Sequence, residues 1–181
     1  MSYLVGGVIV AVALTVLNLV LTFGVIRRLR EHTELLSERS TVGPPDLMLG
    51  VGQAPDTFVA TTTEDEQIRP ETFVGEQLIG FFSPSCQPCR EKAPLFVERA
   101  AAAGRTRALA VVVGGPDEVG ELVTLFEPAA RVVVESTMGT GSITHAFKVK
   151  GFPAICVLDG NGVVTASGFD VVDTAKPSLV S

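Results

Sequence analysis

The feature that most constrains this chain is a pair of cysteines at the point where an apolar run meets a helix-like stretch. The run at residues 78–82 predicts a short buried strand, and a pattern rich in helix formers begins near Cys86. Cys86 is therefore expected at a helix N-terminus, with Cys89 one turn later. Unpaired backbone N–H groups and the helix dipole favour a thiolate there. Two thiols at this spacing can cycle between dithiol and disulfide.

Composition excludes several other classes of protein. The chain has 181 residues, a formal net charge of -6 and only three cysteines. Three cysteines do not make a disulfide scaffold, and an acidic chain lacks the basic stripe of a nucleic-acid surface. We therefore expect no nucleic-acid partner. We also expect no cofactor, because the Gly114-Gly115 turn lacks both of the glycine-rich phosphate-binding patterns.

The N-terminus predicts a single-pass membrane anchor. Residues 4–26 carry no charge, and a helix of this length spans a hydrocarbon core of roughly 30 Å. No basic residue precedes the run, and arginines follow it at once from Arg27, which favours an uncleaved anchor over a signal peptide. Residues 27–46 are expected to form a helical stalk and linker, and residues 47–181 a soluble domain.

The soluble domain alternates strand-like and helix-like segments. Pro94 lies inside the helix that begins at Cys86, where it should cause a kink, and Gly104 should end that helix. The turn at residues 159–162 predicts a hairpin. This order implies an α/β fold with a mixed central sheet and helices on both faces. We expect strands at 58–60, 78–82, 107–113, 131–134, 154–158 and 163–166, helices at 86–103, 117–126 and 142–147, and weak helix from 170 onward.

Two motifs carry a resemblance to a known family. Cys86-Gln87-Pro88-Cys89 followed by Pro94 resembles the active-site helix of the thioredoxin-like fold. Lys150-Gly151-Phe152-Pro153, just before a strand and hairpin, resembles the second characteristic motif of that fold, a cis proline that lies against the dithiol. With its anchor, the chain is similar to the membrane-anchored TlpA/ResA-like thiol–disulfide oxidoreductases. Ser83-Pro84-Ser85 before Cys86 also resembles the MauD-like branch.

The resemblance implies a role for each motif residue. Cys86 is expected to attack, and Cys89 to resolve the mixed disulfide. Phe152 and Pro153 are expected to bind an extended segment of the partner protein. The other expected modulators of the active site are Gln87, Pro88 and Pro94. The implied partners are client proteins with thiols or disulfides and an upstream protein that donates or accepts electrons.

The chain departs from the thioredoxin pattern at two positions. Thioredoxins bury an acid six residues before the first cysteine, where this chain has Gly80, and Glu76 is a weak substitute. Thioredoxins also place a tryptophan directly before the first cysteine, where this chain has Ser85. Both changes concern the redox potential and proton handling rather than the dithiol chemistry.

Other readings of the same residues stay open. The dithiol could hold copper or haem-protein thiols in an assembly chaperone. A peroxiredoxin-like peroxidase shares the fold, although Ile79 and Ser83 replace the proline and threonine of that family. A zinc site lacks a second pair of ligands, so no metal is expected. We expect Cys156 to be an inert core residue.

The side of the membrane is also open. The arginines after the apolar run favour a cytoplasmic domain by the positive-inside rule. The family resemblance favours an extracytoplasmic one.

Overall fold

The computed structural model describes residues 7, 47–138, 141–168 and 170–173. The chain divides into two units, Met1–Gly43 and Pro44–Ser181, and the account below concerns the second. The predicted anchor at 4–26 and stalk at 27–46 lie outside the described residues. In the part that is described, no helix is both long and apolar enough to cross a membrane.

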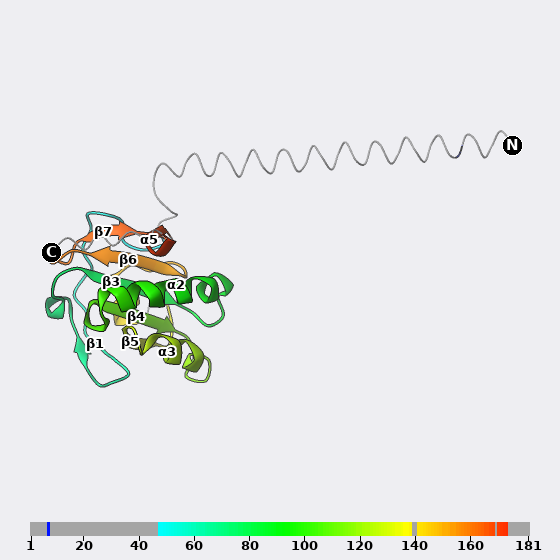
Figure 1. The fold of residues 1–181 in the computed structure, drawn as a ribbon, viewed down its shortest axis with the longest axis horizontal. Coiled ribbons are helices and arrows are strands. Elements are labelled where there is room, and N and C mark those ends of the chain that lie inside the picture. The colour runs from blue at the N-terminus through cyan, green and yellow to red at the C-terminus, as the bar shows by residue number, and fades with distance from the viewer. Residues whose placement is uncertain (1–6, 8–46, 139–140, 169, 174–181) are drawn as a thin grey trace. The chain divides into compact units, whose positions relative to one another are not determined.

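The second unit alternates strands and helices in the predicted order (Figure 1). Its elements are β1 (Ala60–Thr61), β2 (Gln67–Ile68), η2 (Pro70–Thr72), β3 (Gln77–Phe82), α2 (Gln87–Ala103), η3 (Arg105–Arg107), β4 (Ala108–Val113), α3 (Gly120–Phe126), β5 (Arg131–Glu135), α4 (Ser142–Ala146), β6 (Ala154–Leu158), β7 (Val164–Ser167) and α5 (Asp170–Asp173).

The five-stranded sheet has the order β5-β4-β3-β6-β7. Strands β3, β4 and β5 run parallel, whereas β6 is antiparallel to β3, and β7 to β6. Ile79 on the central strand pairs with Leu109 on one side and with Cys156 on the other. The prediction of a mixed central sheet is confirmed.

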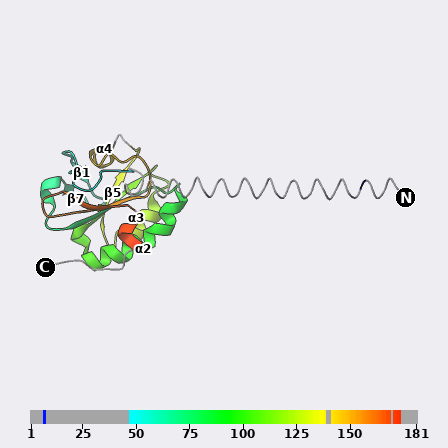
Figure 2. The same ribbon diagram turned by 90° about the horizontal axis from the view of Figure 1, so that it is seen from above.

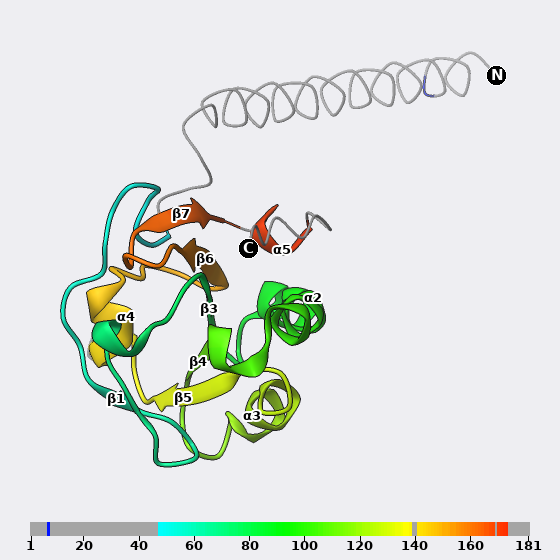
Figure 3. The same cartoon turned by 60° about the vertical axis from the view of Figure 1, so that its left-hand side comes forward.

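Helices cover both faces of this sheet (Figures 2 and 3). Side chains alternate between the faces along a strand, so Ile79 and Phe81 pack in one core cluster and Leu78 and Phe82 in the other. The second cluster contains buried residues of α2, α3 and α5. The first contains residues of α4 and of the segment at 48–58.

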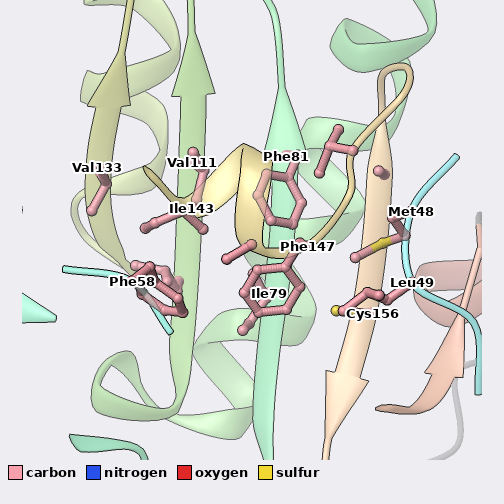
Figure 4. Close-up of a cluster of buried hydrophobic side chains, with 14 of the residues drawn as sticks. Met48, Leu49, Phe58, Ile79, Phe81, Val111, Val133, Ile143, Phe147 and Cys156 are labelled. Atoms are coloured by element: carbon pink, nitrogen blue, oxygen red, sulfur yellow. The ribbon is translucent and has the colours of Figure 1, made fainter. Parts of the chain in front are cut away.

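Aromatic rings fill the core on the α4 side (Figure 4). Phe147 packs against Phe58 and Phe81 with ring centroids 5.9 Å and 5.4 Å apart. Cys156 belongs to this cluster and is fully buried. The prediction of a buried core position for Cys156 is confirmed.

Other segments of the chain cover both edges of the sheet. At the β5 edge, Thr62 forms a bridge with Val133, and the Thr63 N–H donates to the Val132 carbonyl at 2.8 Å. At the β7 edge, Val164 exchanges two backbone hydrogen bonds of 2.8 Å with residues 52 and 53. Neither edge is therefore an open template for strand addition.

The structure corrects three sequence expectations. The strand expected at 58–60 is instead Ala60–Thr61, which pairs with β2 in a separate two-stranded sheet. Phe58 is not part of it, because its ring is buried against Phe73 and Phe147. The helix expected at 117–126 begins only at Gly120, and the strand expected from 107 begins at Ala108, after a 3-10 turn.

Candidate active site

The two cysteines lie where the central strand ends and the longest described helix begins. Strand β3 ends at Phe82, and α2 begins at Gln87 with Cys86 as its N-cap residue in extended conformation. The Cys86 N–H donates to the Ser83 carbonyl at 3.2 Å, which closes the connecting turn. Cys86 thus lies at the N-terminus of α2, where the helix dipole favours negative charge, and its side chain makes no capping hydrogen bond. The predicted strand, helix start and cysteine spacing are confirmed.

The two thiols have different surroundings. Cys86 is half-buried, whereas Cys89 is fully buried in the cluster between the sheet and α2. Both are free thiols in the structure. Burial raises the pKa of Cys89 well above its ordinary value, and the hydrogen bond with Cys86 raises it further. The backbone N–H of Ser83, which donates to the Cys89 sulfur at 3.4 Å, lowers that pKa in part.

A loop far away in the sequence closes the site. The peptide bond between Phe152 and Pro153 is cis, as the sequence predicts. The Cys86 thiol donates a hydrogen bond to the carbonyl oxygen of Phe152 at 3.4 Å. Phe152 is half-buried and packs against both core clusters, and Pro153 is buried. The fold therefore brings Phe152, one of the two predicted binding residues, against the predicted attacking thiol.

The remaining predicted modulators lie on the exposed side of α2. Gln87 and Pro88 are exposed between the cysteines, and Pro94 is exposed two turns later. Helix α2 continues through Pro94 to Ala103. Pro94 has no N–H to donate to the carbonyl of Arg90, and Arg90 is itself an exposed residue. The influence of these three residues on the thiols stays a prediction.

The missing acid at position 80 has a steric explanation. A Cβ atom on Gly80 would lie 2.6 Å from ring atoms of both Phe82 and Phe96. Phe96 is fully buried and packs edge-on against Phe82 with ring centroids 5.1 Å apart. The suggested substitute Glu76 is exposed, so it is not a buried proton acceptor, and that suggestion is wrong. The rings of Phe82 and Phe96 therefore occupy the space that a side chain at position 80 would need.

The sequence analysis did not predict the contacts of Ser83 with the two cysteines. Ser83 is buried, and its hydroxyl lies 3.2 Å from that of the exposed Ser85. Its backbone N–H and carbonyl bond to one cysteine each. The only signal in the sequence was the Ser-Pro-Ser turn before Cys86, which does not reveal these contacts.

Among the residues that the structure describes, no group of three or more histidine, cysteine, aspartate or glutamate side chains could hold a metal ion. Cys156 belongs to the core cluster on the opposite face of the sheet from Cys89.

Comparison with known proteins identifies the fold. No family model and no curated protein matches the sequence. A solved thioredoxin domain of a thiol-disulfide oxidoreductase from Bacteroides vulgatus is similar, with a TM-score of 0.56 and 15% identity over 69% of this chain and 94% of that one. A thiol:disulfide interchange protein from Bacteroides sp. matches with a TM-score of 0.53 and 14% identity, over 72% and 95% of the two chains. A secreted disulfide oxidoreductase of Mycobacterium tuberculosis matches with a TM-score of 0.50 and 18% identity, over 64% and 90%. The described domain therefore has a thioredoxin-like α/β fold with a mixed central sheet.

Proposed function

We propose that this protein is a thiol–disulfide oxidoreductase that exchanges disulfides with client proteins through Cys86 and Cys89. The observation that carries the proposal is the unequal placement of the two thiols. Cys86 is partly accessible at the N-cap of α2, and Cys89 is buried one turn later. An accessible nucleophile followed by a protected one is what two-step exchange requires. The solved oxidoreductases of the same fold support this proposal.

The exchange proceeds in two steps. In the reducing direction, the Cys86 thiolate attacks one sulfur of a client disulfide, and the other client sulfur leaves as a thiolate. Cys89 then loses its proton, which passes to the client thiolate released in the first step, and attacks the Cys86 sulfur, so that the client's second thiolate leaves. The products are a Cys86–Cys89 disulfide and a reduced client, to which two electrons have passed. The opposite direction oxidises the client.

The burial of Cys89 fits the order of these steps. Its raised pKa keeps Cys89 protonated while Cys86 reacts. The Ser83 N–H then offers a hydrogen bond to the sulfur that must carry charge in the second step. Phe152 and Pro153 are proposed to hold an extended client segment beside Cys86, and Gln87, Pro88 and Pro94 to modulate the thiols.

The membrane tether belongs to the same proposal. An anchor at residues 4–26 would hold the domain near a membrane-bound electron donor or acceptor, as in the TlpA/ResA-like and MauD-like groups that the motifs resemble. The side of the membrane follows from labelling intact cells with a membrane-impermeant maleimide. Labelling of Cys86 before lysis places the domain outside the cytoplasm. Labelling only after lysis places it inside, and recovery of the chain in the soluble fraction overturns the tether.

The decisive experiment for the function is a redox titration of the full chain in detergent. We expect a reversible two-electron transition that disappears in Cys86→Ser and in Cys89→Ser. Cys156→Ala is the matched control and should keep the transition, because Cys156 lies in the other core cluster. A potential near or below about -250 mV indicates a reductant, and one of about -120 to -180 mV an oxidant or isomerase. Thiols that never pair would overturn the proposal.

A further inference from the structure

The segment that contacts both cysteines is a β-turn with Pro84 at its second position. The Cys86 N–H donates to the Ser83 carbonyl at 3.2 Å, and the Ser83 N–H donates to the Cys89 sulfur at 3.4 Å. Proline fixes its own backbone angle φ and restricts the residue before it to extended conformations. The position of the Pro84 ring therefore limits where the Ser83 N–H can point.

The chain that leaves strand β4 packs directly against this ring. Phe82 at the end of β3 pairs with Val112 of β4, so the two strands leave the sheet as neighbours. A Cβ atom on Gly114 would lie 3.1 Å and 3.2 Å from two side-chain carbons of Pro84, and 3.2 Å from a methyl carbon of Val119. Carbon atoms in contact are ordinarily about 3.5–4.0 Å apart. Only a residue without a side chain therefore fits at position 114 while Pro84 keeps its place.

Among the groups at this contact, the Pro84 ring is the one that can move. Val119 is buried in the core cluster that contains residues of α2 and α3. The Gly114 N–H donates to the Glu135 carbonyl of the neighbouring strand β5 at 3.0 Å. Pro84 is half-buried, and its carbonyl accepts from the exposed Arg90 at 3.3 Å. A side chain at position 114 would therefore push the ring outward and move the whole turn with it.

On the basis of the proposed function, we propose that Gly114 is a positioning residue for the second step of exchange, because it leaves room for the turn that aims the Ser83 N–H at the Cys89 sulfur. In that step the Cys89 sulfur attacks the Cys86 sulfur, a bond forms between them, and the client sulfur leaves with the electrons of its bond to Cys86. The Cys89 proton passes to the client thiolate released in the first step.

The Ser83 N–H acts on the sulfur that carries charge in this step. Negative charge develops on the Cys89 sulfur before the new bond forms. The Ser83 N–H lowers the pKa of Cys89 and stabilises that charge. The first step does not use this contact, because Cys86 attacks with its own sulfur. Displacement of the turn should therefore affect the second step alone.

Gly114→Ala should slow the second step and leave the first unchanged. Displacement of the Ser83 N–H weakens one hydrogen bond to a charged atom, so we expect resolution of the mixed disulfide to be about tenfold slower. Gly115→Ala is the matched control, since its added Cβ would lie no closer than 3.7 Å to the exposed side chain of Glu118. The control should resolve the mixed disulfide at the wild-type rate.

The experiment measures the two steps separately on the full chain in detergent. The substrate is a peptide whose cysteine is activated as a mixed disulfide with a coloured thiol, and release of the colour reports the first step. Rapid acid quenching and mass spectrometry then follow the peptide attached to Cys86 and its loss when Cys89 resolves it. Urea denaturation shows that each variant is folded. A change of stability alone leaves the ratio of the two rates unchanged, whereas a displaced turn lowers the second rate relative to the first.

Replacement of the Pro84 ring tests whether the effect passes through this contact. Pro84→Ala removes the ring carbons that a side chain at position 114 would meet. It should itself slow the second step, because Ser83 is then less restrained. In that background Gly114→Ala should cause no further slowing, as expected for two residues that act through one contact.

The outcomes separate the positioning role from the proposed function. A wild-type rate of resolution in Gly114→Ala would overturn the role, and so would an equal loss in both Pro84 backgrounds or a loss shared equally by both steps. If Gly114→Ala does not fold, Pro84→Ala decides alone, and a wild-type rate of resolution in it overturns the role. Failure of the wild type to react with the peptide disulfide would instead overturn the proposed function itself.

Discussion

The backbone N–H of Ser83 donates to the sulfur of Cys89 at 3.4 Å, across the turn that joins strand β3 to helix α2. The carbonyl of Ser83 accepts from the N–H of Cys86 at 3.2 Å. A single residue thus connects both cysteines through its main chain. Because these contacts are backbone contacts, the geometry of the pair depends on the turn more than on any one side chain.

Replacement of each cysteine should stop disulfide exchange at a different step. Cys86→Ser should reduce insulin reduction to background, because no accessible nucleophile remains. Cys89→Ser should still attack once and then accumulate as a mixed disulfide, because nothing resolves it. A non-reducing gel with a client protein distinguishes the two variants. Cys156→Ala should behave as the wild type, and a mixed disulfide that forms equally with Cys86→Ser would reverse the assignment.

The glycine at position 80 should not tolerate a side chain. Gly80→Ala places a Cβ atom 2.6 Å from ring atoms of Phe82 and Phe96, two buried side chains that cannot both move aside. We expect a loss of about 1–3 kcal/mol in the free energy of unfolding, measured by urea denaturation. Gly120→Ala at the start of α3 is the matched control, since its added Cβ would meet no atom within 4 Å. Equal stability of the two variants would contradict the crowded site.

The local part of this site could be predicted from the sequence, and the tertiary part could not. The apolar run at 78–82, the spacing of Cys86 and Cys89 and the stop at Gly104 depend on neighbours along the chain, and the structure confirms them. The ring of Phe96 over Gly80 depends on how α2 lies on the sheet. The hydrogen bond from Cys86 to the Phe152 carbonyl joins residues 66 positions apart. Period and propensity carry no information on such contacts.

Local propensity also misjudged segments whose partners are distant. The apolar residues at 58–60 fit a strand, yet Phe58 is used as a core ring against Phe73 and Phe147. The suggestion of Glu76 as a proton acceptor rested on its distance along the chain from Gly80. Glu76 is exposed and lies directly before strand β3.

The buried thiol of Cys156 should make the protein less stable at alkaline pH. Burial raises the pKa of Cys156 far above its ordinary value of 9.0. Below pH 9 the folded and unfolded chains both keep this proton. Above it the unfolded chain loses the proton and the folded chain does not. The free energy of unfolding should therefore fall with rising pH, by about 1.4 kcal/mol per pH unit from this thiol.

Cys156→Ala separates this contribution from all other titrations. The variant should be less stable at neutral pH because of the cavity. Its free energy of unfolding should nevertheless fall less steeply above pH 9 than that of the wild type. Denaturant unfolding at a series of pH values measures both slopes, and parallel slopes would show that Cys156 ionises equally in the folded and unfolded chains.

The carboxylate of Glu135 should hold the start of helix α4. Glu135 is buried at the end of β5, and its oxygens accept from the Ile143 N–H at 2.7 Å, the Thr144 N–H at 3.2 Å and the Thr144 hydroxyl at 2.7 Å. Glu135→Gln keeps the shape of the side chain. It replaces one accepting oxygen by an NH2 group that must face these donors. We expect a loss of about 1–3 kcal/mol in the free energy of unfolding, because buried donors are left unpaired.

Glu121→Gln on the exposed surface of α3 is the matched control for this change, and its stability should stay within about 0.5 kcal/mol of the wild type. Hydrogen exchange should locate the effect of Glu135→Gln, since the amides of Ile143 and Thr144 lose their acceptor and should exchange faster than those of α2. Helix α4 supplies core residues to the cluster that contains Phe81 and Cys156. Faster exchange confined to α2, with that of α4 unchanged, would show that the carboxylate does not hold this helix.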